Sequence, residues 1–242
     1  MIKSKKGFSL LEILVAMALV ALIFSMAANF SFTRTQASQE LVDDLTIAIE
    51  SATDEAVLKN SMVRVRFKLS DYESNEDSLE EIEVEDITQK IFFEYLLDSK
   101  NLLESRERIN RADLTQTQME EYIQEQKKNE SSFGRLSDLK NGKIEIEYPL
   151  RILGIGYPQE SKFITTLSSS IYFYPNGDKN PGTIFIFDQE RIHYLVIPPF
   201  GLNIKHEIIP LEFTDDETPE QLFERATAKA KETFEKLRLQ TL

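Results

Sequence analysis

The stretch from Lys5 to Ile23, KKGFSLLEILVAMALVALI, decides the fold. It belongs to a run from Phe8 to Ala28 whose only charged residue is Glu12. As a helix this run would be about 31 Å long, close to the thickness of the hydrocarbon core of a bilayer. Three lysines and no acid precede it in residues 1–7. The positive-inside rule therefore predicts that residues 1–7 stay in the cytoplasm and that the chain after residue 28 lies on the opposite side of the membrane.

Two simple interpretations of this segment are a secretory signal peptide and a signal anchor of no special family. Ser25-Met26-Ala27 imitates a small-residue cleavage site before Ala28, as a signal peptide requires. Glu12 fits both interpretations poorly, because a carboxylate at the centre of a membrane helix costs about 2.5–3.5 kcal/mol. A third interpretation must therefore account for the acid.

The same segment resembles the N-terminal signal of type IV pilins and type II secretion pseudopilins. It has a short basic leader, then Gly7, the aromatic Phe8, and Glu12 at the fifth position after the glycine. The resemblance implies that a prepilin peptidase cleaves after Gly7 and methylates the new amino terminus of Phe8. It also implies that Glu12 pairs with the amino terminus of a neighbouring subunit and sets the register of assembly. A buried carboxylate and a buried ammonium offset each other's desolvation only when they pair. Cleavage would remove three lysines and take the net charge from −13 to −16.

A single helix is predicted over residues 8–60, with residues 8–28 in the membrane. No proline or glycine lies between Phe8 and Asn60. The second half carries a helical apolar stripe at Leu41, Leu45, Ala48, Ala52 and Ala56. Such a helix would be about 75 Å long, and its second half would pack on a folded head.

The head is predicted over residues 61–214 and is rich in strands. Residues 62–69 alternate, with Val63, Val65 and Phe67 on one face and Arg64, Arg66 and Lys68 on the other, which predicts a half-buried strand. Further strands are predicted at 143–148 (with Tyr148 facing inward), 164–174, 183–187, 191–197 and 202–209. Close turns between them favour antiparallel pairing. Residues 70–142 are interpreted as an insertion, with an acidic loop at 71–86, packed residues at 87–103 and a helix at 111–128.

Residues 215–242 are predicted to form a C-terminal amphipathic helix. Thr218, Pro219 and Gln221 combine a helix cap, a proline at the first helical position and the glutamine of a capping box. The expected fold class is therefore α+β and pilin-like. It joins a long N-terminal helix to a mostly antiparallel head with an inserted acidic and helical region, and it ends in a helix folded back on that head.

Composition excludes several classes of function. A net charge of −13 makes a nucleic-acid surface unfavourable, and the absence of cysteine excludes a thiolate zinc site and a thiol nucleophile. Asp178–Gly182 begins like a calcium loop, but its glycine comes one place early and Gln189 stands at position twelve. Gly154-Ile155-Gly156 is half of a dinucleotide fingerprint, and residues 168–170 with His193 make a weak candidate for a triad. We therefore predict no catalytic residue, no metal site, no cofactor and no enzymatic activity.

Four further segments resemble the H-type minor pseudopilin and the related fimbrial minor pilins. They are Glu55–Phe67, Ser170–Gly177, Gly182–Phe187 and Arg191–Ile204. The resemblance implies a minor pseudopilin that assembles into, or primes, the periplasmic pseudopilus of a type II secretion system. Its partners would be the prepilin peptidase and other pseudopilins or pilins bound through the N-terminal helix. It would cross the inner membrane once, with the head in the periplasm. The alternatives are a minor pilin of a type IV pilus and a membrane-anchored periplasmic binding protein.

Overall fold

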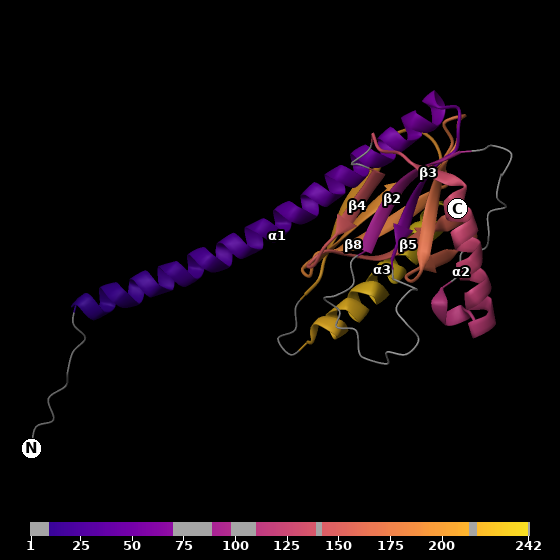
Figure 1. Ribbon diagram of the computed structural model, residues 1–242. Coiled ribbons are helices and arrows are strands. Elements are labelled where there is room, and N and C mark those ends of the chain that lie inside the picture. Colours follow the sequence, from indigo (N-terminus) through magenta and orange to yellow (C-terminus); the bar gives the residue numbers. More distant parts are fainter. Residues whose placement is uncertain (1–9, 70–88, 98–109, 139–141, 213–216, 242) are drawn as a thin grey trace, which may run out of the picture. The chain divides into compact units, whose positions relative to one another are not determined.

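The computed structural model describes residues 10–69, 89–97, 110–138, 142–212 and 217–241 (Figure 1). Within this part the protein is α+β, and every ladder between its strands is antiparallel. The chain divides into two compact units, residues 1–41 and residues 42–242, and the division falls inside the first helix. Each unit is described by itself.

Helix α1 (Leu10–Leu58) has 49 described residues, and its end lies within two residues of the predicted end at residue 60. Asn60 adopts a left-handed backbone conformation with φ of 46°, and the Ser61 N–H bonds the Ala56 carbonyl, which closes the helix end. All five positions of the predicted apolar stripe are buried. In the second unit the small side chains of Ala48, Ala52 and Ala56 let the helix pack closely on its neighbours.

The first sheet has five strands, and β2 lies at its centre. These strands are β1 (Val63–Lys68), β2 (Gln89–Leu96), β3 (Phe133–Arg135), β4 (Lys143–Ile146) and β7 (Ser168–Phe173). β1 pairs with β7 on one side and with β2 on the other, and β3 and β4 share the far edge of β2.

The second sheet has the strand order β10-β9-β8-β5-β6. Its strands are β5 (Arg151–Tyr157), β6 (Lys162–Ile164), β8 (Gly182–Phe187), β9 (Arg191–Ile197) and β10 (Lys205–Pro210). The antiparallel prediction is confirmed, and the described strands form two sheets.

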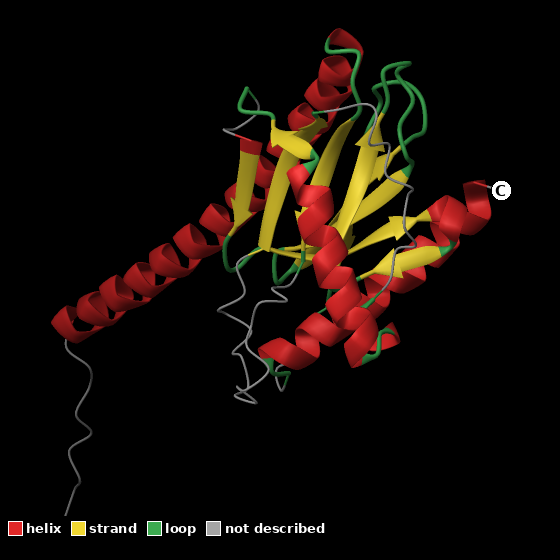
Figure 2. Ribbon diagram, turned by 45° about the vertical axis from the view of Figure 1, so that its right-hand side comes forward, coloured by secondary structure: helices red, strands yellow, loops and turns green. Residues whose placement is uncertain are grey.

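Helices α2 (Gln116–Ser131) and α3 (Pro219–Thr241) lie over one face of the sheets, and residues 42–58, the part of α1 in the second unit, lie over the other (Figure 2). Short 3-10 turns occur at Arg111–Asp113 and Pro158–Glu160. α3 inserts Ala226, Ala230 and Phe234 against Phe185 and other buried residues of the second sheet. The predicted capping box is confirmed, because Thr218 and Gln221 bond each other's backbone N–H groups at 3.1 and 3.4 Å.

Several sequence predictions for the head were wrong. β2 falls inside the predicted insertion at 70–142, yet it pairs with β1 along six residues and is integral to the sheet. The single strand expected at 164–174 is two strands, β6 and β7, separated where Leu167 has a φ of 63°. β5 was not predicted, and Tyr148 is exposed because β4 ends at Ile146. The acidic loop at 71–86 lies outside the described residues.

Candidate functional site

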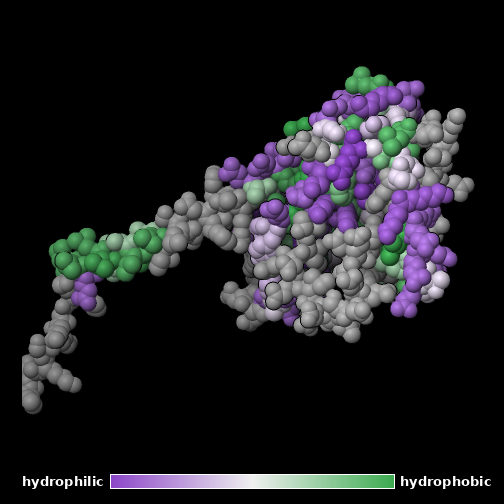
Figure 3. Space-filling view, in the orientation of Figure 1, coloured by the Kyte–Doolittle hydropathy of each residue, from purple (hydrophilic) through white to green (hydrophobic). Residues whose placement is uncertain are grey.

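The first part of α1 presents an apolar surface. The described side chains of residues 10–22 are all exposed. Leu10 is 78% exposed and Met17 is 69% exposed, and hydrophobic side chains cover the described start of the helix (Figure 3). A contiguous apolar surface of this kind marks a site of contact with lipid or with another protein.

Glu12 lies in the first turn of α1, within this apolar surface. It borders a shallow hollow with Ile13, Ala16, Met17, Val20 and Ala21. Positions 12, 16 and 20 are four residues apart and share one helix face. Small residues such as Ala16 and Ala21 permit another helix to approach closely, as between helices in a membrane. Gly7 and Phe8, the other predicted site residues, lie outside the described residues.

Residues 2–28 match the family model of the prokaryotic N-terminal methylation motif. The chain therefore carries a prepilin-type methylation motif. This motif implies processing by a prepilin peptidase and assembly with other pilin-type subunits, and it fits a pilin or a pseudopilin. No curated protein sequence and no solved structure matches the chain.

The methylation motif overlaps the predicted membrane segment at residues 8–28. Among the residues that the structure describes, no helix is both long and apolar enough to cross a bilayer. Phe8, Ser9 and the side chains of residues 23–28 belong to the predicted segment and lie outside that description.

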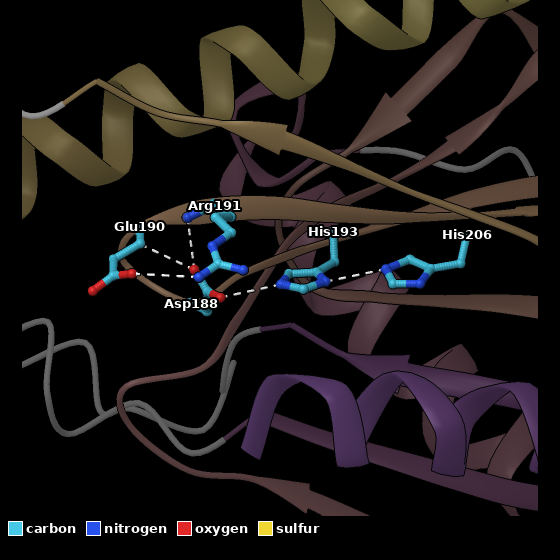
Figure 4. A network of polar contacts seen from close by, with 5 residues as sticks. All are labelled: Asp188, Glu190, Arg191, His193 and His206. Carbon is cyan, nitrogen blue, oxygen red and sulfur yellow. Dashed lines mark hydrogen bonds and ion pairs between the residues drawn. The ribbon is translucent and has the colours of Figure 1, made fainter. Parts of the chain in front are cut away.

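Beyond the methylation motif, the two histidines of the chain converge in the second sheet (Figure 4). His193 Nε2 lies 3.1 Å from Asp188 Oδ2, and His193 Nδ1 lies 3.1 Å from His206 Nε2. A carboxylate only accepts, so Nε2 of His193 donates to Asp188, whereas the tautomers of the two rings decide which ring donates between Nδ1 of His193 and Nε2 of His206. The sequence did not reveal this network, because 13 residues separate the two histidines and strand pairing brings them together.

The charges of the network follow from its contacts. Burial raises the pKa of the Asp188 carboxyl, but hydrogen bonds from His193 and from the backbone of Glu190 and Arg191 outweigh it and hold that pKa below its ordinary value. Burial, and then the charge of His193, lower the pKa of His206, against an opposing effect of Asp43.

The planes of the two imidazole rings differ by 12°, and their nitrogens face each other in Figure 4 with 3.1 Å between the two atoms.

The serines considered for a triad are engaged elsewhere. The Ser169 hydroxyl bonds the Tyr157 hydroxyl at 2.6 Å, and Ser168 lies 3.4 Å from the Tyr122 hydroxyl. Both ring nitrogens of His193 are occupied by Asp188 and His206. The structure thus brings neither Ser168 nor Ser169 into a triad with His193.

The loop that resembles a calcium site is organised as a turn. Asn180 accepts a hydrogen bond from the Tyr174 hydroxyl at 3.0 Å, and Asp178 accepts one from the Asn176 amide at 2.7 Å. The buried Lys179 lies between them in sequence, and its ammonium donates to the Gly201 carbonyl at 2.5 Å. Burial lowers the pKa of Lys179, against an opposing effect of Glu50. A buried cationic group at this position disfavours calcium.

A buried ion cluster lies on the first sheet, where the sequence predicted an exposed polar face. Arg64 Nε lies 2.6 Å from the Glu94 carboxylate, and Arg66 Nη2 lies 2.9 Å from it. All three residues are buried, and the Arg64 guanidinium lies 3.6 Å from the centre of the Phe133 ring. The strand itself was predicted, but the prediction that it is half-buried was wrong, because the side chains on both of its faces are buried.

A polar groove of about 520 Å³ lies between the 3-10 turn at 111–113, β6 and α3. Its lining includes Asp113 and Glu235 together with Lys162 and Lys231. This mixture of charges favours no one class of ligand.

Proposed function

We propose that the protein is a structural subunit of a pilin-type filament, and specifically a minor pseudopilin of a type II secretion system. The observation that supports this most directly is the methylation motif at residues 2–28, with the exposed apolar start of α1 beside it. Subunits would associate by burying these helices against one another as they leave the membrane. We propose no enzymatic activity and no cofactor.

In this proposal the peptidase cleaves after Gly7 and methylates the amino group of Phe8. Glu12 then pairs with that amino group in a neighbouring subunit and sets the register of the helices. The apolar hollow around Glu12 supports this role, because a carboxylate in such surroundings gains from a cationic partner.

The amino terminus of the membrane-extracted protein tests the processing step. We expect intact mass and N-terminal sequencing to show N-methylated Phe8 as the first residue. A chain that begins at Ala28 would identify a secreted protein, and an unprocessed Met1 would identify a simple anchor. Either of these results would contradict the proposal.

The substitution Glu12→Ala tests the assembly step. We expect normal membrane insertion and cleavage, with incorporation into filaments reduced at least about tenfold. Glu40→Ala is the matched control, because Glu40 is an exposed acid on the same helix. Incorporation of Glu12→Ala at the level of Glu40→Ala would remove Glu12 from the assembly mechanism.

A minor pilin of a type IV pilus is the alternative that shares the same motif. Deletion of the gene separates the two. Loss of protein export with surface pili intact supports the pseudopilin, whereas loss of surface pili with export intact supports the pilin. A membrane-anchored binding protein would leave both processes unchanged.

A further inference from the structure

Strand β10 forms one edge of the second sheet, and among the described strands it pairs only with β9. Lys205, Glu207, Ile208 and Pro210 are exposed. Apolar side chains are exposed there too, with Phe200 at 68%, Leu202 at 47% and Ile208 at 44%. An edge strand offers a row of backbone donors and acceptors to a further strand.

The hydrogen bonds of the strand show which groups face outward. The Leu211 N–H donates to the Glu190 carbonyl at 3.0 Å, so residue 211 faces β9. Backbone groups alternate along an antiparallel strand, and residues 205, 207 and 209 therefore face β9 as well. His206 and Ile208 then present their N–H and C=O groups outward. Pro210 also holds an outward position, where its missing N–H disturbs no bond to β9.

We propose that β10 pairs antiparallel with β10 of a second copy of this chain, in the register that places His206 opposite His206. This register sets Lys205 opposite Glu207 of the second copy, twice by symmetry. It also sets Ile204 opposite Ile208. Opposite charges and apolar pairs in these positions stabilise a ladder.

Charge disfavours the neighbouring symmetric registers. Centring the ladder on residue 205 places Lys205 opposite Lys205, and centring it on residue 207 places Glu207 opposite Glu207. Like charges directly opposite each other destabilise a ladder. Centring it on residue 208 faces Glu207 with Ile209 and forms no charge pair. The charged residues that protect the edge against unspecific pairing therefore select one partner and one register.

Two properties keep this pairing weak. The strand has six residues, and each copy carries a net charge of −13. Charges more than about 8 Å apart are screened at physiological salt. The close attraction between Lys205 and Glu207 is therefore weakened less than the long-range repulsion between the two negatively charged copies. Pairing becomes populated where copies are concentrated. The inference does not require the N-terminal helix and is independent of the proposed function.

Single-cysteine variants of the full chain, extracted from membranes in detergent, test the register. The chain has no cysteine, so His206→Cys introduces the only thiol. Hydrogen-bonded antiparallel pairs have Cα atoms about 5.5 Å apart, within disulfide range. In Lys205→Cys the two Cα atoms would be about 8 Å apart, outside that range. We expect oxidation to cross-link His206→Cys at least about tenfold more than Lys205→Cys.

Charge reversal tests the partner. In His206→Cys chains, Lys205→Glu or Glu207→Lys alone places like charges opposite each other and should reduce cross-linking at least about tenfold. A mixture of the two variants, carrying different tags, restores both opposite-charge pairs, and we expect cross-links only between the two kinds of chain. This expectation holds for pairing between two copies and for no other occupant of the edge.

Three results would overturn the inference. These are equal cross-linking of Lys205→Cys, cross-linking that ignores the charge reversals, and no cross-link in variants whose thermal unfolding shows them to be folded. A mixture of Ile204→Cys and Ile208→Cys chains provides the same readout if His206→Cys does not fold. Copies that co-purify without these cross-links would associate through α1 alone, which leaves the proposed function intact and removes β10 from the interface.

Discussion

Glu94 holds two guanidinium groups within the first sheet, one from Arg64 and one from Arg66. Buried charges of this kind are stable only while they are paired and hydrogen-bonded. The stability of the first sheet therefore depends on the Glu94 carboxylate. In the ladder between β1 and β2, Glu94 lies opposite Arg64.

Replacing Glu94 with glutamine should lower the free energy of unfolding by about 3–5 kcal/mol, because two buried cations lose their counter-ion. Thermal and chemical unfolding of the full chain in detergent measure this loss. Glu145→Gln is the control, since Glu145 bonds Lys143 on the surface at 2.5 Å and the same substitution there should have much less effect. Equal effects at the two sites would contradict the buried cluster.

His206 should make stability depend on pH. Its folded-state pKa lies below the ordinary value of 6.5, so the unfolded chain binds the proton more readily. The stabilising contribution is present above about pH 6.5 and is lost as the pH falls toward the folded-state pKa. Titration of one group changes the free energy of unfolding by at most about 1.4 kcal/mol per pH unit. Solvent around the half-exposed ring makes the change smaller.

Thermal unfolding at pH 7.5, 6.5 and 5.5 measures this dependence. We expect His206→Gln to flatten the loss of stability in this range. Asp188 titrates below this pH range, because its pKa is held under the ordinary value of 3.8. An unchanged slope in the variant would assign the pH dependence to other groups.

At the scale of elements, α3 packs on the second sheet by placing the ring of Phe234 directly against Gly156. A Cβ atom at Gly156 of β5 would lie 2.3 Å from Cδ2 of Phe234. Phe234 is fully buried and also lies 5.7 Å from the Phe163 ring, centre to centre. The sequence Gly154-Ile155-Gly156, which looked like half of a nucleotide motif, therefore serves the packing of a helix on a sheet.

Gly156→Ala should destabilise the protein by about 1–3 kcal/mol, because the ring must shift out of its packed position. Phe234→Leu, which shortens the side chain above the glycine, should recover part of that loss in the double variant. Denaturant unfolding of the wild type, the two single variants and the double variant measures the coupling. Strictly additive losses would show that the two residues do not compete for the same space.

Elements with a strong local signal were predicted well. α1 and α3 carry apolar stripes at helical spacing, and α3 also carries its capping box, so each could be located from nearby residues alone. β5 and β2 could not be located from nearby residues alone. β5 has two glycines and no alternation, and β2 lies in a stretch whose place in the sheet depends on pairing with the distant β1.

At the scale of the whole molecule, the two units present different surfaces for contact with other molecules. The first presents apolar side chains that need a covering surface, and its motif is contiguous in sequence. Among its described residues, the second buries most of its apolar side chains within itself and has β10 at the edge of a sheet. Assembly through the first unit and strand pairing through the second are therefore separate interactions, and each has its own test.

Local sequence patterns were enough to predict the α+β class, the two long helices and the prepilin-type signal at residues 2–28. These features depend on residues that are adjacent in the chain or one helical turn apart. The burial of Arg64 and Arg66 on Glu94, the contact of His193 with His206 and the place of β10 at the edge of the described sheet depend on the fold. The physical reason is that strand pairing joins residues 13 to 30 positions apart, and such pairing depends on the whole fold rather than on any local pattern.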